Sequence, residues 1–170
     1  LAVKPVTPAT LYVGTDTGVF RSTNGGNTWR TVNTGLSTQI VSCLAINPIT
    51  PSTLYVGTNR GIFRSRDSGN HWTAVNTGLT GQNIGALSLA INPVSPATLY
   101  AGTDNFGVFR STNNGATWMA TGLVDCGVYA VAINPRTPSI LYAGTNGSGI
   151  LRSMDSGGTW TTVNDGLTIK

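Results

Sequence analysis

The sequence is poor in the residues from which catalytic and metal sites are most often built. It contains one histidine, His71, two cysteines, Cys43 and Cys126, and no glutamate, so all six of its acids are aspartates. Two cysteines cannot supply a disulfide framework, and no Cys-x-x-Cys or Cys/His zinc spacing occurs. A lone histidine leaves no Ser-His-Asp arrangement to assemble. We therefore expect free, buried thiols, no metal and no cofactor.

Charge is scarce as well, at 9% of the 170 residues, and the net charge is +4. Four basic residues recur at one place in a repeat, which favours a structural role over a phosphate-binding stripe. They are Arg21, Arg64, Arg110 and Arg152. No apolar run approaches the ~18 residues of a bilayer span, and neither a leader pattern nor methionine opens the chain. The sequence thus predicts no nucleic-acid partner, no membrane span, and a processed chain or a fragment.

Four copies of one eight-residue pattern are present instead. They read STNGGNTW at 22–29, SRDSGNHW at 65–72, STNNGATW at 111–118 and SMDSGGTW at 153–160. Their tryptophans are 43, 46 and 42 residues apart, a period typical of one propeller blade and too short for an independent domain. A related block precedes each copy, such as TLYVGTDTGVFRS at 10–22 and TLYVGTNRGIFRS at 53–65.

The pattern Ser-x-Asp-x-Gly-x-Thr-Trp resembles the Asp-box, or bacterial neuraminidase repeat. Asn24 and Asn113 replace the acid in the first and third copies, and His71 replaces threonine in the second. The resemblance extends over nearly the whole chain and implies a β-propeller, as in sialidases, xyloglucan hydrolases, sortilin-type receptors and photosystem assembly factors. It says little about activity, because one fold carries many functions. We refer to the four eight-residue copies as boxes.

Each repeat divides into four strand-like runs with turns between them. In the second repeat these runs are 40–46, 53–57, 61–65 and 72–76, and proline-rich segments such as 47–52 must be connections because proline cannot donate to a ladder. The sequence therefore predicts an all-β fold, a propeller unit of four blades that are each a four-stranded antiparallel sheet. The expected blades are 1–36, 37–79, 80–123 and 124–170 of a single domain.

The boxes themselves are expected to be structural turns. Such a turn needs a glycine at positive φ and an Asx side chain that accepts backbone N–H groups, and an asparagine oxygen can replace the aspartate oxygen. The tryptophan is expected to lock the turn onto its own blade. The residues so assigned are Ser22, Asn24, Gly26, Trp29, Ser65, Asp67, Gly69, Trp72, Ser111, Asn113, Gly115, Trp118, Ser153, Asp155, Gly157 and Trp160.

The strand order places the loops between second and third strands, and the inter-blade connections, on the face opposite the boxes. Their amides, acids and one exposed aromatic, Phe106, suit neutral sugars, although polar loops covered only by water would look the same. The candidate ligand-binding residues are Asp16, Asn59, Arg60, Asp104, Asn105, Phe106 and Asn146. The inter-blade connections add Gln39, Gln82, Asn83 and Asp125 to this face.

No catalytic residue is predicted. The resemblance implies that a sialidase-like site would need a glutamate, which the chain lacks, and that a xyloglucan hydrolase would use paired aspartates. Asp16 and Asp104 occupy equivalent loops, which favours turn chemistry over an acid/base pair. We expect a non-catalytic recognition or scaffold propeller outside the cytoplasm, with a neutral glycan or a protein as partner. The alternatives are a glycoside hydrolase fragment and a protein-assembly scaffold.

The residues at the two chain ends do not decide how a propeller ring would close. Eleven residues separate leucine from proline in GLSTQIVSCLAINP, whereas a join of the C-terminal GLTIK to the N-terminal LAVKP leaves seven. Either a four-blade ring closes with a short inner strand, or the open edges pair with a second copy. We favour a homodimer that completes an eight-bladed ring.

Overall fold

A computed structural model describes residues 1–37, 40–79 and 84–167. Within these ranges the chain forms sixteen strands and no helix. The strands are β1 (Ala2–Val3), β2 (Leu11–Thr15), β3 (Gly18–Ser22), β4 (Arg30–Thr31), β5 (Val41–Ile46), β6 (Leu54–Thr58), β7 (Gly61–Ser65), β8 (Thr73–Ala74), β9 (Ala86–Ile91), β10 (Leu99–Thr103), β11 (Val108–Ser111), β12 (Met119–Ala120), β13 (Val128–Ile133), β14 (Leu141–Thr145), β15 (Gly149–Ser153) and β16 (Thr161–Thr162).

The strands form four separate antiparallel sheets, each of four strands in chain order. We number these sheets as blades 1 to 4, from β1–β4 to β13–β16. The proline-rich segments connect the first strand of a blade to the second, as expected. In blade 2 the side chain of Asn47 stabilises this turn, because its Oδ1 accepts the N–H groups of Ile49 and Thr50 at 2.9 Å. Asn92 and Asn134 repeat the arrangement in blades 3 and 4.

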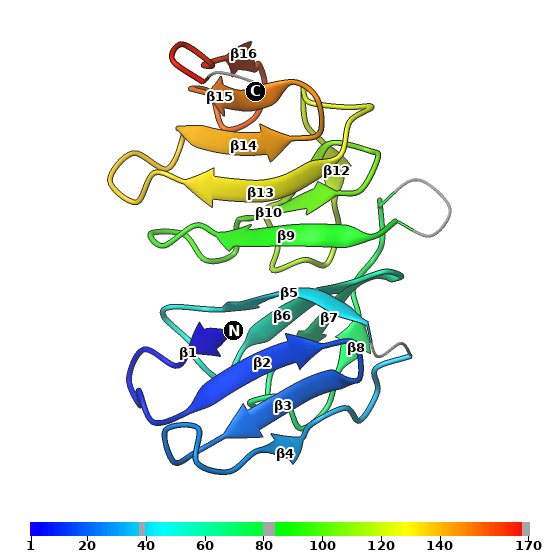
Figure 1. Ribbon diagram of the computed structural model, residues 1–170, viewed down its shortest axis with the longest axis vertical. Coiled ribbons are helices and arrows are strands. Elements are labelled where there is room, and N and C mark those ends of the chain that lie inside the picture. Colours follow the sequence, from blue (N-terminus) through cyan, green and yellow to red (C-terminus); the bar gives the residue numbers. More distant parts are fainter. Residues whose placement is uncertain (38–39, 80–83, 168–170) are drawn as a thin grey trace.

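The four blades follow one another along the longest axis of the molecule, with blade 1 at one end and blade 4 at the other (Figure 1). The chain therefore forms an open arc, and the expected alternative of a closed four-blade ring is not observed. The core lies in three layers between consecutive blades rather than inside any one of them. Tyr12, Val19 and Trp72 pack between blades 1 and 2, and Tyr55, Ile62 and Trp118 are their counterparts between blades 2 and 3.

Candidate functional site

Each box is a hydrogen-bonded turn between the third and fourth strands of its blade. In blade 2 the Ser65 hydroxyl donates to Asp67 Oδ1 at 2.8 Å and accepts the Gly69 N–H at 2.8 Å. The same aspartate oxygen accepts the His71 N–H at 2.9 Å. Asn24 and Asn113 accept the equivalent N–H groups at 2.9 Å in blades 1 and 3. Both side-chain types therefore close this turn.

The tryptophans correct one expectation. Two of them, Trp72 and Trp118, bond the preceding blade instead of fastening the turn to their own. Trp72 donates its indole N–H to the Val32 carbonyl of blade 1 at 2.8 Å. Trp118 donates likewise to Val75 of blade 2 at 2.8 Å. The sequence could not reveal this, because the acceptor lies about one full repeat earlier in the chain. The box thus stabilises the junction between two blades.

At the junctions between blades 1 and 2 and between blades 2 and 3, a tyrosine and an arginine complete the contact from the other side. Tyr12 and Arg21 of blade 1 donate to the Ser68 carbonyl in the box of blade 2, at 3.1 and 2.7 Å. Tyr55 and Arg64 bond to Asn114 of blade 3 in the same way, at 3.2 and 2.7 Å. Arg21 and Arg64 therefore hold carbonyl groups inside the fold, which is the structural role that their register predicted.

Two box carboxylates have strongly lowered pKa values. The side chain and backbone N–H of His71 lower the pKa of Asp67 to about 2, with a His71 Nδ1 to Asp67 Oδ2 distance of 2.6 Å. The backbone and hydroxyl of Thr159, together with Ser153, lower the pKa of Asp155 to about 2. Hydrogen bonds to the charged form are the cause in both turns.

We expect Asp67→Ala to lower the free energy of unfolding by about 1 kcal/mol at neutral pH, because the turn loses its acceptor. Asp67→Asn should be close to the wild type, since Asn24 and Asn113 fill the same role. The contribution of the Asp67 charge is present above its unfolded pKa and is lost as pH falls towards the folded value of about 2.

Thermal unfolding between pH 5 and pH 2 measures this difference. The wild type should lose slightly more stability than Asp67→Asn over that range, by less than about 1 kcal/mol, because the Asp67 side chain is 43% exposed and screened by water. Equal melting of the wild type and Asp67→Ala at neutral pH would show that the turn does not need this acceptor.

The face opposite the boxes carries the candidate residues named from the sequence. Asp16, Asn59, Arg60, Asn105 and Asn146 are exposed there. Asn59 and Arg60 share the loop of blade 2, and the other three come one each from the loops of blades 1, 3 and 4. Inter-blade connections lie beside two of these loops, because Asp104 N–H bonds the Gly85 carbonyl and Asn146 N–H bonds the Gly127 carbonyl. Gln39, Gln82 and Asn83 lie outside the described residues. Their part in this face stays a prediction.

Phe106 differs from expectation. It is half-buried and packs against the core between blades 2 and 3, so it is not the exposed stacking platform that the sequence indicated. Asp104 beside it is also half-buried, and its Oδ1 has no hydrogen-bond partner among the described residues. The one-residue insertion in this loop therefore adds core contact rather than an exposed ring.

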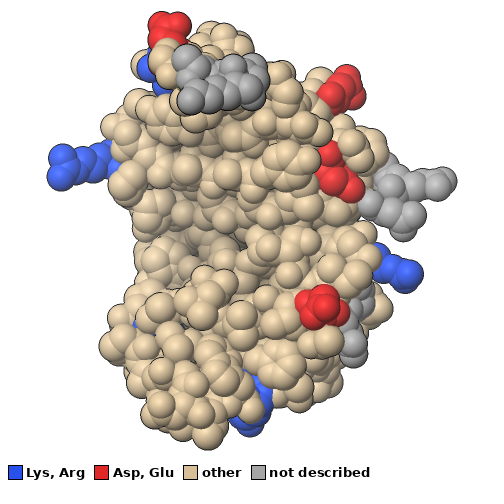
Figure 2. Space-filling view, viewed as in Figure 1, with Lys and Arg blue, Asp and Glu red and all other residues tan. Residues whose placement is uncertain are grey.

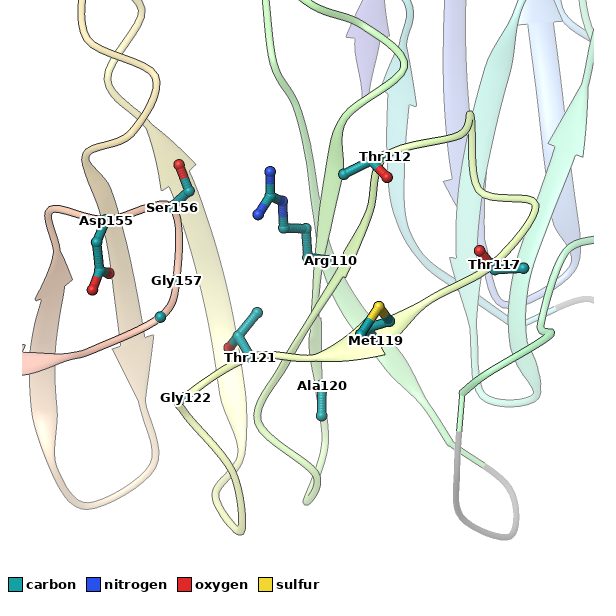
Figure 3. A pocket seen from close by; sticks show the side chains of 11 residues that line it. Arg110, Thr112, Thr117, Met119, Ala120, Thr121, Gly122, Asp155, Ser156 and Gly157 are labelled. Carbon is teal, nitrogen blue, oxygen red and sulfur yellow. The ribbon is translucent and has the colours of Figure 1, made fainter.

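A cavity of about 290 Å³ lies between blades 3 and 4, on the side of the boxes. Figure 3 shows Arg110 reaching from its strand towards the turn of Ser156 and Gly157, with Thr121 and Met119 nearby. The Arg110 guanidinium lies over the ring of Tyr100, 6.0 Å from its centroid. Among the described residues it has no carbonyl acceptor of the kind that Arg21 and Arg64 bond. The lining residues are Arg110, Thr112, Thr117, Met119, Ala120, Thr121, Gly122, Asp155, Ser156, Gly157 and Gly158.

The cavity has an identifiable cause in the sequence, although the sequence analysis missed it. Blades 1, 2 and 4 have four residues between the box tryptophan and Thr-Gly-Leu or Asp-Gly-Leu, whereas blade 3 has only Met119 and Ala120. The valine and asparagine of the other blades are therefore missing. Trp160 has no valine carbonyl to reach and donates to Gly157 of its own box at 3.1 Å. A comparison of repeat lengths after each tryptophan would have located this gap.

The sequence matches no protein-family model and no curated protein. Solved structures do resemble it. An ancestral GH74 enzyme is 25% identical with a TM-score of 0.78, over 91% of this chain and 22% of that one. The GH74 xyloglucanase from Xanthomonas campestris is 20% identical with a TM-score of 0.76, over 95% and 29%. An auxiliary nutrient binding protein from Bacteroides thetaiotaomicron is 18% identical with a TM-score of 0.67, over 89% and 37%.

The chain is a β-propeller unit. The sheets, their order and these similarities agree on that fold, and the unit spans well under half the length of each of the three solved chains. Within the described ranges the propeller holds no group of three or more His, Cys, Asp or Glu side chains with the spacing of a metal site. No described segment is a helix long and apolar enough for a membrane span.

Few charges mark the surface of the propeller. On the face seen in Figure 2 most of the Lys, Arg and Asp side chains are scattered singly, and no broad patch of one sign forms. Cys43 and Cys126 are free and half-buried, and burial raises the pKa of Cys43 to about 12. The thiols are free as expected, but neither is fully buried.

Proposed function

We propose that this propeller unit is a non-catalytic recognition module for neutral carbohydrate. The observation that carries the proposal is the cavity between blades 3 and 4, where Arg110 lacks the carbonyl acceptor of Arg21 and Arg64. A planar guanidinium donates two parallel hydrogen bonds and therefore fits a pair of sugar hydroxyls. The sparse surface charge suits an uncharged ligand better than an anionic one.

The remaining lining supports this ligand class. Met119 is 74% exposed beside the cavity and offers an apolar surface to a sugar ring, while Thr117 and Thr121 contribute hydroxyl groups. A volume of about 290 Å³ is at the small end for ligand pockets. We therefore place one terminal sugar unit in it, with a dissociation constant of about 0.1–1 mM because polar groups exchange water for hydroxyls with little net gain.

The loop face of Asp16, Asn59, Arg60, Asp104, Asn105 and Asn146 is the second candidate for the same function. The specific observation in its favour is the buried Asp104 Oδ1 without a partner among the described residues. A ligand hydroxyl could satisfy this oxygen. Asn105, exposed next to it, would contribute a planar amide.

The proposal excludes catalysis on chemical grounds. The chain has no glutamate, and its aspartates are either box turn acceptors or single residues in separate loops. Similarity to GH74 structures supports the alternative of a hydrolase fragment whose acids lie on other blades. A scaffold for protein assembly remains the alternative without a sugar ligand. An extracytoplasmic location, and a second copy that completes the ring, belong to the same proposal.

A glycan array followed by calorimetry tests the function. We expect a neutral glycan to bind, Met119→Ala to weaken its binding about 10-fold through the lost apolar contact, and Arg110→Lys to weaken it similarly through the lost planar fork. The matched controls are Thr73→Ala and Arg64→Lys, which alter the equivalent positions of blade 2 and should leave affinity unchanged.

Asp104→Asn and Asn105→Ala form the second arm of the experiment. Weakened binding in this arm alone would move the site to the loop face. Binding to no neutral glycan, or binding indifferent to all four substitutions, would overturn the proposed function. Hydrolysis of a bound xyloglucan oligosaccharide by the wild type would overturn its non-catalytic part.

A further inference from the structure

The two ends of the arc are the uncovered halves of one junction. Within the chain, every junction joins a trailing face of one blade to the leading face of the next. At the first two junctions the trailing face supplies tyrosine and arginine donors and a valine carbonyl, whereas the leading face supplies a box carbonyl and a tryptophan. The third junction has the tyrosine bond, from Tyr100 to the Ser156 carbonyl. Blade 4 exposes a trailing face, and blade 1 exposes a leading face (Figure 1).

The trailing face of blade 4 keeps the junction residues without their partners. Tyr142 is 40% exposed, whereas Tyr12, Tyr55 and Tyr100 are at most 1% exposed. Ile150 is 37% exposed, although its counterpart Ile62 is fully buried. Arg152 and Val163 occupy the places of Arg21 and Val32, and Val163 N–H bonds the Ile150 carbonyl as Val32 N–H bonds that of Val19.

The glycines of this face agree that no described residue packs closely against it. A side chain at Gly78 would collide with the backbone of Trp118, the next tryptophan along the arc. A side chain at the equivalent Gly166 would meet nothing within 4 Å. The backbone of blade 4 is thus already shaped for the close approach of a following tryptophan, which none of the described residues provides.

The leading face of blade 1 carries the complementary set. Trp29 is 39% exposed, while Trp72 and Trp118 are 4% and 2% exposed. Gly25 has a φ of 70°, which matches the 61° and 59° of Ser68 and Asn114, whose carbonyls accept the junction bonds. The acceptor turn of blade 1 therefore has the conformation that the tyrosine and arginine of a preceding blade require.

We infer that blade 4 of one chain docks onto blade 1 of a second copy, head to tail, by the contacts of the internal junctions. Tyr142 and Arg152 donate to the Gly25 carbonyl of the other copy, and its Trp29 donates to the Val163 carbonyl. Two such junctions close a ring of eight blades by two-fold symmetry. The second copy is the occupant because one chain presents both halves of this junction, residue for residue.

This inference deepens the assembly part of the proposed function and is independent of its carbohydrate part. Failure of the glycan experiment leaves the junction untouched, and failure of the pairing leaves the cavity between blades 3 and 4 intact. The cavity lies within one chain, so the two experiments cannot be confused.

Light scattering of the 170-residue chain at micromolar concentration tests the pairing. We expect a mass of twice 17.6 kDa. Ile150→Arg should shift the chain to the monomer, because it places a charge in the junction. We expect the dissociation constant of the dimer to rise at least about 100-fold. Ser148→Arg adds the same charge to an exposed loop of blade 4 and should leave the dimer intact. Thermal melts confirm that both variants fold.

A mixing experiment identifies the orientation. Trp29→Arg should also give a monomer, because it blocks the leading face alone. A mixture of Ile150→Arg and Trp29→Arg retains one intact junction, between blade 4 of the tryptophan variant and blade 1 of the isoleucine variant. Head-to-tail pairing therefore predicts that dimers reappear only on mixing.

Three outcomes would overturn the inference. They are a wild-type chain that stays monomeric, a Trp29→Arg variant that remains as dimeric as the wild type, and a mixture that stays monomeric. The second outcome would indicate pairing of two blade 4 faces instead.

Discussion

Trp118→Ala is expected to lower the free energy of unfolding by about 3–5 kcal/mol, the usual cost of removing a large buried aromatic side chain. The indole is 2% exposed in the core between blades 2 and 3, and its N–H bond to Val75 at 2.8 Å is lost with it. That carbonyl is left without its partner, which adds to the cavity cost. Urea unfolding measures the change.

The matched control is Trp29→Ala, which removes the same residue from the equivalent box position. Trp29 is 39% exposed and no described blade packs over it, so we expect a loss of about 1 kcal/mol. Both variants should be compared at submicromolar concentration, where association between chains contributes least. Equal losses would show that the tryptophan stabilises its own turn and not the junction.

Gly57→Ala is expected to cost about 3 kcal/mol, because the second strand of a blade lies directly against the first strand of the next. An added Cβ would lie 2.5 Å from the Ala86 carbonyl oxygen and in collision with Cys43 Sγ. The carbonyl belongs to β9 and cannot yield without loss of its ladder. Thermal and urea unfolding measure the effect.

Gly144→Ala is the control for this substitution. Gly144 occupies the same place in blade 4, but its added Cβ would meet only the Ala130 Cβ, at an ordinary 3.7 Å. We expect a change close to zero. A large loss at Gly144, or none at Gly57, would contradict the view that close inter-blade packing fixes this glycine.

The large effects fall at junctions because each core layer is shared between two blades. Because each blade contacts only its neighbours, the free energy of unfolding is approximately the sum of the stabilities of the single blades and of the junctions between them. A four-blade arc has three internal junctions and two uncovered faces, so its end residues contribute less than their internal counterparts. The same residue type therefore carries different weight at Trp29 and Trp118.

The sequence determined the class of fold. The four boxes with their tryptophans, the proline turns and the strand-like runs predicted four antiparallel sheets of four strands, and the structure has them. The hydrogen bonds of the box were also predictable, because Ser65, Asp67 and Gly69 lie within five residues of one another. Such interactions are local, and their chemistry can be derived from residue type and spacing alone.

Tertiary structure decided the rest of the candidate site. Phe106 looked exposed as an insertion in a polar loop, yet it is half-buried against the core between two blades. The cavity at Arg110 depends on the short segment at Met119 and on the box of blade 4, where Asp155 lies 36 residues later. Neither the burial of Phe106 nor the cavity at Arg110 follows from the pattern of one repeat, because each depends on contacts between two neighbouring blades.

The sequence by itself thus fixed the blade, its strands and its turns, since local hydrogen bonds and alternating side chains define them. Only the tertiary structure decided that the blades form an open arc, that Trp72 and Trp118 bond the preceding blade, and that Tyr142 and Trp29 are left at its two ends. The physical reason is that equivalent residues have similar sequence neighbours in every repeat. Their burial depends on whether another blade lies against them.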